Sequence, residues 1–443
     1  MSSLPQTGLI AHLKAKFVIH SPIIAHILIN YTQFKLKNGL TVIHHPDPNS
    51  KLCVLNILYN VGSKDEHPEK TGFAHLFEHL MFGGSVNVSD FDNQLQIAGG
   101  DNNAFTSNDI TNYYITLPAN NIETGFWLES DRMFSLDFSQ KVLDVQKAVV
   151  IEEFKERYIN QPYGDVWLKL LPLAYKKHPY RWPTIGKDFS HIENATLDDV
   201  KAFFYSFYAP NNAILVISGN IDLKTTKELS EKWFGPIPAR VINRLPKQIE
   251  PEQIEKRTEH VYNDVPLDLI IMGYHICERM HPDYYAVDLM TDILGGGKSA
   301  RLFNELLKKQ KLFSEIDCYQ SDDFDAGLVI VEGKLIKGVT HQQAEDAIEK
   351  VLNELIECGI SETELEKVKN KSETNIRFND MGVLNKAMKL AYAAYYGDIE
   401  LANSEVSEYL KVSAHDIQRV AKTYLKSTNC NILYYHAKNE STK

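Results

Sequence analysis

The sequence lacks the features of several common protein classes. Its cysteines are odd in number and widely separated, and they contain no Cys-x-x-Cys pair: Cys53, Cys277, Cys318, Cys358 and Cys430. They support neither a disulfide framework nor a thiolate zinc site. A reducing compartment fits them best, so we expect a cytoplasmic protein and favour a periplasmic one less. No run approaches the ~18 uninterrupted apolar residues that a membrane span requires.

Excess positive charge is also missing. The 443 residues include 47 Lys and Arg against 58 Asp and Glu, which gives a formal net charge of −11. A protein that neutralises nucleic-acid phosphates needs the opposite balance, so we expect no nucleic-acid partner and leave peptide or cationic partners open. Hydrophobic residues at 44% and charged residues at 24% match an ordinary globular protein, and the length allows two or three domains.

The chain is organised as two similar halves. Residues 1–30 are predicted to be an N-terminal extension and only a weak candidate for a targeting signal. The first domain is placed at 31–240, a Pro-rich linker at 241–256 and the second domain at 257–443. The ends of the two domains align, because SAHDIQRVAKTYLKSTNCNILYY matches TLDDVKAFFYSFYAPNNAILVIS in pattern. We therefore expect an α+β fold of two homologous domains, each with a mixed α/β sheet.

The most informative motif is His75-Leu-Phe-Glu78-His79. On a helix, residues four apart share a face, so the two histidines can present imidazole nitrogens to one metal ion, with Glu78 beside it. A catalytic zinc usually has three protein ligands and a water, so a third ligand must come from elsewhere. A helical pattern over 139–158 offers three glutamates for it: Glu152, Glu153 and Glu156. The alternative interpretation is that both segments are helices with polar, solvated faces.

In its setting TGFAHLFEHLMFGGS, this motif resembles the inverted zinc-peptidase motif of the pitrilysin, insulysin and mitochondrial processing peptidase family. The resemblance extends over the chain, through FKLKNGLTVI, GGDNNAFTSNDITNYY, QKAVVIEE and GGGKSARLFNELL. It implies a two-domain subunit, like a bacterial processing peptidase, that forms one half of a clamshell chamber. It also implies a zinc metalloendopeptidase with one Zn²⁺ per chain, acting on peptides or unfolded polypeptide segments.

The resemblance further implies a role for individual residues. Relatives take the third ligand from the last glutamate of a segment resembling E-R-x-V-V-x-x-E, so the implied zinc ligands are His75, His79 and Glu153. Glu78 is then the general base, which takes the proton of a zinc-activated water and passes it to the leaving amine.

Two residues are predicted to support these ligands, and two to bind the substrate. Glu156 is a candidate acid behind the ligands, and Gln146 stands where many relatives have a glutamate. Gln can hydrogen-bond a histidine ligand but carries no negative charge. In relatives, the peptide adds as a strand to a sheet edge beside the zinc helix. The matching segment is 100–106, with Asn103 and Ala104 at its centre; the alternative is a structural hairpin.

The second half has no metal motif of its own and aligns as a degenerate copy, with Val287, Met290 and Thr291 opposite the motif residues. In relatives this half supplies an arginine and a tyrosine to the substrate, and here Leu307 and Ser314 occupy those positions. The resemblance therefore favours a heterodimer with a homologous subunit that lacks the zinc motif, with a homodimer as the alternative. A noncatalytic assembly subunit of the same fold, or a metal-dependent hydrolase of a nonpeptide substrate, stays open.

Overall fold

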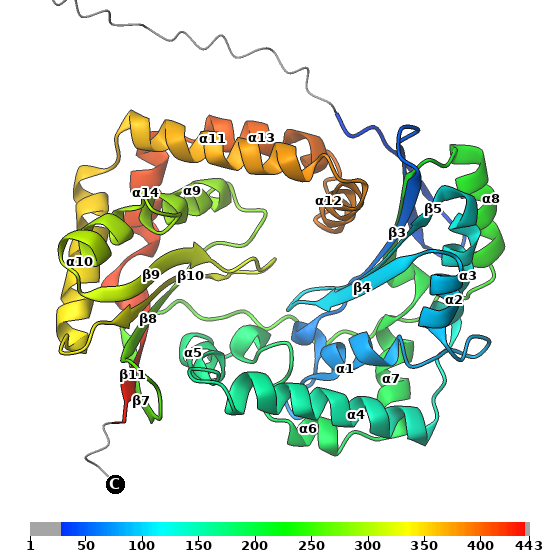
Figure 1. Ribbon diagram of the computed structural model, residues 1–443, viewed down its shortest axis with the longest axis horizontal. Helices are drawn as coiled ribbons and strands as arrows, with labels where there is room; N and C mark the ends of the chain where they lie inside the picture. The colour runs from blue at the N-terminus through cyan, green and yellow to red at the C-terminus, as the bar shows by residue number, and fades with distance from the viewer. Residues whose placement is uncertain (1–27, 439–443) are drawn as a thin grey trace, which may run out of the picture.

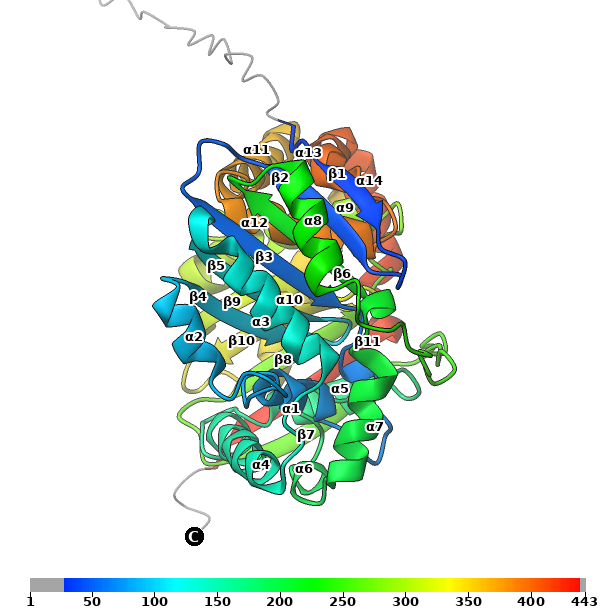
Figure 2. The same ribbon diagram turned by 90° about the vertical axis from the view of Figure 1, so that its right-hand side faces the viewer.

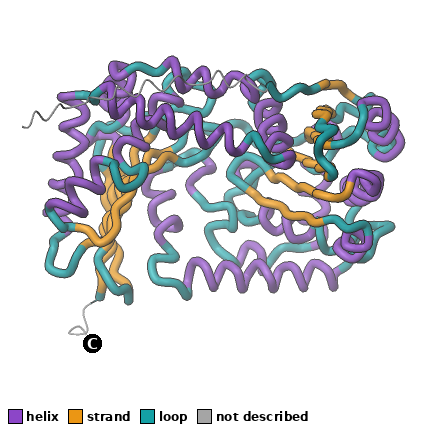
Figure 3. Tube along the Cα trace, turned by 45° about the horizontal axis from the view of Figure 1, so that its top comes forward, coloured by secondary structure: helices purple, strands orange, loops and turns teal. Residues whose placement is uncertain are grey.

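The computed structural model describes residues 28–438, so most of the predicted N-terminal extension lies outside the described residues (Figure 1). The described chain forms two halves, each built on one mixed sheet with helices around it, which confirms the expected fold class. Figure 3 shows the strands gathered in two separate groups. No helix within 28–438 is long and apolar enough to cross a membrane.

The first half contains a six-stranded sheet in the order β1-β2-β6-β3-β5-β4. Its strands are β1 (Thr32–Lys35), β2 (Thr41–Pro46), β3 (Leu52–Tyr59), β4 (Asp101–Thr106), β5 (Thr111–Pro118) and β6 (Ala213–Gly219). β2 and β6 are parallel, and the other neighbours are antiparallel. Within the described residues, the strand β4 is at the edge of the sheet and pairs with β5 alone, with Ala104 opposite Tyr113.

Helices cover both faces of this sheet (Figure 2). Those of the first half are α1 (Phe73–Leu80), α2 (Phe91–Ile97), α3 (Ile122–Phe134), α4 (Gln140–Phe154), α5 (Val166–Ala174), α6 (Ser190–Glu193), α7 (Leu197–Phe207) and α8 (Leu223–Trp233). Alternate residues of a strand point to opposite faces. Leu55 and Ile57 of β3 therefore share one face, where they pack with α1, α3 and α7. Val54 and Leu58 lie on the opposite face of the sheet.

The second half repeats the arrangement. Its sheet has the order β7-β11-β8-β10-β9, formed by β7 (Arg257–Asn263), β8 (Leu269–His275), β9 (Phe313–Gln320), β10 (Leu328–Leu335) and β11 (Cys430–Ala437). Its helices are α9 (Tyr284–Leu294), α10 (His341–Cys358), α11 (Glu362–Asn379), α12 (Val383–Tyr395), α13 (Leu401–Lys411) and α14 (Ala414–Tyr424). β11 pairs with β7 in parallel and with β8 antiparallel, as β6 does with β2 and β3.

The aligned ends of the halves have the same local structure. Thr196 begins α7 and Ser413 begins α14, and each forms a capping box with an aspartate three residues later. The hydroxyl of the Thr or Ser accepts a hydrogen bond from the backbone N–H of the aspartate. The carboxylate of the aspartate in turn accepts one from the backbone N–H of the Thr or Ser, so two donors are satisfied at each helix start. The sequence repeat therefore corresponds to the same helix and strand in both halves.

The two halves exchange helices across the space between them. The face of the first sheet that carries Val54 and Leu58 is covered by Ala387 and Leu390 of α12, which belongs to the second half. In return, Leu170 of α5 packs with the second sheet. Figure 1 shows α12 beside β3 and α5 beside β8. Residues 241–256, the predicted linker, form no helix or strand.

Candidate metal and catalytic site

The helix α1 begins at a glycine that no other residue replaces easily. Gly72 has φ +89, and a Cβ there would lie 2.6 Å from the Ile185 carbonyl oxygen. Gly72 offers no side-chain cap, and the carboxylate of Glu66 takes that role, accepting from the N–H groups of Gly72 (2.9 Å) and Ala74 (2.8 Å). Burial raises the pKa of Glu66 well above its ordinary value, against the effect of these two hydrogen bonds. Glu66 therefore fixes the start of the helix that carries the motif.

The structure brings His75 and His79 of α1 together with Glu153 of α4. The Nε2 atoms of His75 and His79 lie 3.6 and 3.4 Å from Oε2 of Glu153, and the two rings are nearly perpendicular at a centroid distance of 4.9 Å. Burial, with smaller contributions from His79 and Arg157, lowers the pKa of His75 to about 3. The imidazole of His75 is therefore neutral near pH 7, which is the form that ligates metals. Of the glutamates left open by the pattern, Glu153 is the one in this cluster.

Glu78 lies on the same helix and is connected to the edge strand. The hydroxyl of Thr106, the last residue of β4, donates to Oε2 of Glu78 at 2.6 Å. Burial raises the pKa of Glu78, and the hydrogen bond from Thr106 opposes that rise. A half-buried carboxylate is thus held beside the histidines, next to the strand on which Asn103 and Ala104 lie.

The outer edge of β4 is open in the described part of the chain, since no strand beyond it joins the sheet. The backbone N–H of Ala104 donates to the side-chain oxygen of its neighbour Asn103 at 2.8 Å. A strand that added to this edge would exchange that local hydrogen bond for a backbone one.

Among the described residues, Gln146 and Glu156 make no hydrogen bond or ion pair with His75, His79 or Glu153. Gln146 is half-buried on α4, with its amide near Gly83, and no hydrogen bond in the described chain joins it to a histidine. His75 Nδ1 is instead buried with no partner among the described residues. Glu156 is exposed, in the π-helical turn Lys155–Ile159 that follows α4. The charged group next to the cluster is Arg157, which pairs with Oε1 of Glu153 at 3.0 Å.

Sequence reasoning missed Thr106, Arg157 and Glu66. Arg157 is four residues after Glu153, and that i, i+4 spacing on a helical pattern was a usable signal. Thr106 closes the segment already assigned to substrate. No local sequence pattern identifies Glu66 as the cap of α1, because it lies in a loop and the turn at Gly72 determines which N–H groups it contacts.

Both halves of the chain match models of one family of proteases. Residues 41–187 match "Insulinase (Peptidase family M16)", and residues 194–372 match "Peptidase M16 inactive domain". The zinc protease PqqE of Helicobacter pylori is 32% identical over 407 residues, which are 90% of this chain and 91% of that protein. The chain belongs to peptidase family M16. The family expected from the motif is thereby confirmed.

Two solved structures extend the comparison. A protease from Helicobacter pylori superposes with a TM-score of 0.87 at 29% identity, over 92% of this chain and 100% of that one. The periplasmic protease PqqL from Escherichia coli shares the fold with a TM-score of 0.76 at 18% identity. That match covers 92% of this chain and 48% of PqqL, so this chain has the size of about half of PqqL.

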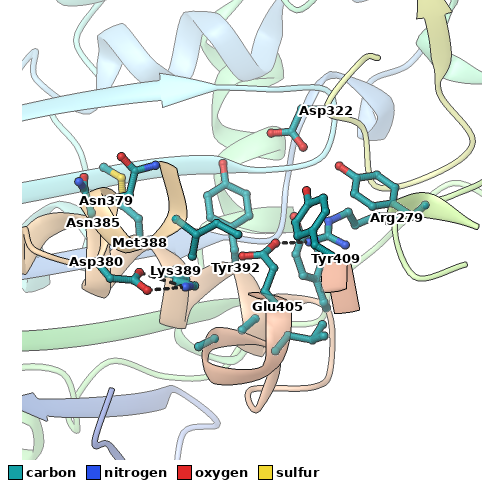
Figure 4. Close-up of a pocket in the computed structure, with 16 residues that line it drawn as sticks. Arg279, Asp322, Asn379, Asp380, Asn385, Met388, Lys389, Tyr392, Glu405 and Tyr409 are labelled. Carbon is teal, nitrogen blue, oxygen red and sulfur yellow. Dashed lines mark hydrogen bonds and ion pairs between the residues drawn. The ribbon is translucent and has the colours of Figure 1, made fainter. Parts of the chain in front are cut away.

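The second half of this M16 chain has neither an arginine nor a tyrosine at the two positions singled out from the sequence. Leu307 packs against the core of its own half, and the exposed Ser314 donates its hydroxyl hydrogen to the Lys334 carbonyl oxygen at 3.2 Å. A cavity of about 470 Å³ lies among α9, α11, α12 and α13 (Figure 4). Four of its charged groups form ion pairs, Arg279 with Glu405 and Lys389 with Asp380, and no residue of the His75 cluster lines it.

Proposed function

We propose that this M16 chain is a zinc endopeptidase, with His75, His79 and Glu153 as the metal ligands and Glu78 as the general base. The observation that supports it best is that two imidazole Nε2 atoms, on α1, lie within 3.6 Å of one carboxylate oxygen on α4. The donor set of two nitrogens and one oxygen suits zinc and leaves a fourth position for water. The residues therefore fit the metal that the names of the curated relatives imply.

Zinc, when bound there, would acidify a water and polarise the scissile carbonyl. The chain's own residues hold the reacting groups. Glu78 accepts a proton from the attacking water and delivers it to the leaving amine, and Thr106 orients the carboxylate through its hydrogen bond. The raised pKa of Glu78 brings its proton affinity closer to neutral pH, where proton transfer in both directions is easier.

The open edge of β4 is the proposed site for the peptide. A substrate strand would pair with the backbone around Ala104, and Asn103 would release the N–H that it now occupies. Strand addition recognises the backbone of the peptide rather than its side chains, so it suits peptides and unfolded segments of varied sequence. Because Thr106 ends the same strand, a peptide on this edge would run past Glu78.

Two measurements test the proposal. Glu78→Gln is expected to keep zinc, measured by elemental analysis, and to lose cleavage of a quenched fluorescent peptide, since Gln cannot accept the proton. Glu153→Gln should lower zinc content, while the control Glu156→Gln should leave it unchanged. Cleavage by Glu78→Gln near the parent rate, or zinc loss only in Glu156→Gln, would contradict the assignment.

A partner-dependent form of this function is favoured by Leu307 and Ser314. Leu307 has no polar group and the Ser314 hydroxyl is used within its hairpin, so neither can orient a peptide carbonyl. We propose a homologous subunit without the zinc motif as the partner, in keeping with the match to about half of PqqL. The chain purified alone and with its nearest paralogue should differ in peptide cleavage. Full activity of the isolated chain favours a homodimer, and no activity in either case favours a noncatalytic subunit.

A further inference from the structure

A second group of metal-binding side chains lies on the other half of the molecule. Asp268, His341 and His436 each offer one ligand atom, and these atoms all lie within 4.8 Å of one another. We propose that these three residues, with His260 next to them, form a second binding site for a divalent transition metal such as zinc. The ligands are imidazole nitrogens and a carboxylate oxygen, which suit zinc, nickel or copper and not magnesium or calcium.

The three residues come from different elements that only the fold brings together. Asp268 directly precedes β8, His341 is the first residue of α10, and His436 is in β11. Asp268 and His341 are separated by 73 residues and His436 follows after 95 more, by their numbers in the sequence. A metal here would join the start of α10 to the sheet beneath it.

The hydrogen bonds of His341 and Asp268 leave one acceptor atom free on each side chain, and these two atoms lie near each other. His341 Nε2 lies 3.1 Å from the Leu269 carbonyl oxygen, which can only accept, so this nitrogen carries the proton and Nδ1 is left with a lone pair. Asp268 Oδ1 accepts from the backbone N–H of Ala437 at 2.8 Å. Its Oδ2 lies 3.9 Å from His341 Nδ1. Two lone pairs at this spacing repel each other, and a metal ion or a proton between them removes that repulsion.

The proton on His341 Nε2 is held by a backbone carbonyl, an arrangement typical of histidines that ligate metals. That hydrogen bond leaves Nδ1 as the atom of His341 that is able to ligate the ion.

His260 completes the group on the edge strand. Because β7 and β11 are parallel, with His260 opposite Tyr434 and Tyr262 opposite His436, these four rings lie on one face of the sheet. His260 Nδ1 is 2.9 Å from His436 Nε2, and the ring of Tyr262 stacks on His436 at 4.4 Å.

This site is separate from the one proposed for catalysis. It lies on the α10 side of the second sheet, whereas α5 covers the opposite face, and Figure 1 shows α10 and α1 in different halves of the molecule. The ion would therefore act on the stability of the second half and not on the peptide bond. None of its residues belongs to the His75 cluster.

The test is metal binding by a chain without the first cluster. The double variant His75→Ala/His79→Ala, stripped with chelator, is titrated with Co²⁺ and with Zn²⁺, with calorimetry and the visible absorption of cobalt as readouts. We expect one ion per chain and a rise in the unfolding midpoint. Adding His436→Ala or Asp268→Asn should abolish both, with at least a tenfold loss of affinity.

The matched control is His281→Ala, which changes an exposed histidine next to Asp283 in the same half. It should leave binding and the midpoint shift unchanged. No binding by the double variant, or equal binding after His436→Ala, overturns the proposal. If His436→Ala does not fold, as judged by circular dichroism, Asp268→Asn decides, since its remaining oxygen can still accept from Ala437. These outcomes do not depend on whether the chain cleaves peptides.

Discussion

Glu66 should determine how firmly the motif helix is held. Glu66 is 2% exposed, and its carboxylate accepts from two N–H groups at the start of α1, those of Gly72 and Ala74. Glu66→Ala leaves both donors buried without an acceptor. An unsatisfied buried donor costs about 1–3 kcal/mol, so the expected loss in the free energy of unfolding is about 2–6 kcal/mol. Glu66→Gln keeps one acceptor oxygen, and about half that loss, or ~1–3 kcal/mol, is expected.

The assay separates a local effect from a global one. Urea unfolding of the metal-free variants gives the change in stability, and hydrogen–deuterium exchange of peptides covering 66–80 reports on α1 itself. Because His75 and His79 are on that helix, zinc affinity should fall along with protection. Glu69→Ala is the matched control, since Glu69 is three residues away with a side chain that is 75% exposed. Equal stability and equal exchange in Glu66→Ala and Glu69→Ala would refute the role of Glu66 as the cap of α1.

Three further predictions follow from single contacts. Thr106→Val removes a hydrogen bond to the Glu78 carboxylate that is worth about 1.5–3 kcal/mol, so the pKa of Glu78 should rise by about 1–2 units. The acidic limb of the plot of kcat/KM against pH should move to higher pH by the same amount. Thr106→Ser, which keeps the hydroxyl, should not move it. Glu129→Gln breaks a fully buried pair with Arg132 and should cost about 3–5 kcal/mol in urea unfolding, and a loss under 1 kcal/mol would contradict this. Burial opposes ionisation of Asp325, but His178, Lys64 and Lys247 outweigh it and hold its pKa below the ordinary value. Its stabilising contribution is therefore present above about pH 4 and lost as pH falls through the folded pKa, so Asp325→Asn should lose less stability than the parent between pH 5 and pH 3 in thermal unfolding.

The sequence predicted those features that depend on local pattern. The spacing of His75 and His79 put them on one helical face, and the segment 100–106 was assigned to a sheet edge, where β4 lies. The repeat of the two halves was predictable because α7 with β6 and α14 with β11 use the same capping and strand pattern. The choice of Glu153 as the third ligand depended on the family resemblance, because the helical pattern alone did not distinguish it from Glu152 and Glu156.

Contacts between distant segments could not be predicted in this way. The exchange of α5 and α12 between halves depends on which apolar face finds which sheet, and helical periodicity gives the face but not its partner. The group of Asp268, His341 and His436 likewise has no motif, because its members come from three elements. A shared helix face does not guarantee a shared contact either. Gln146 lies one heptad before Glu153 and therefore on the same face of α4, but its amide lies near Gly83. The Nδ1 atom of His75 has no hydrogen-bond partner among the described residues.

The second half, which carries no zinc motif, still bears on the motif helix through one short segment. Lys64 pairs with Asp109 at 2.5 Å and with Asp325 of the second half at 3.2 Å. Two residues later, Glu66 caps α1. Lys64 and Glu66 lie in one short turn, so the ion pair with Asp325 connects the second half to the residues at the start of α1. The second half supplies no residue to the His75 cluster, but through Asp325 it is joined to the segment whose Glu66 caps the helix of His75 and His79.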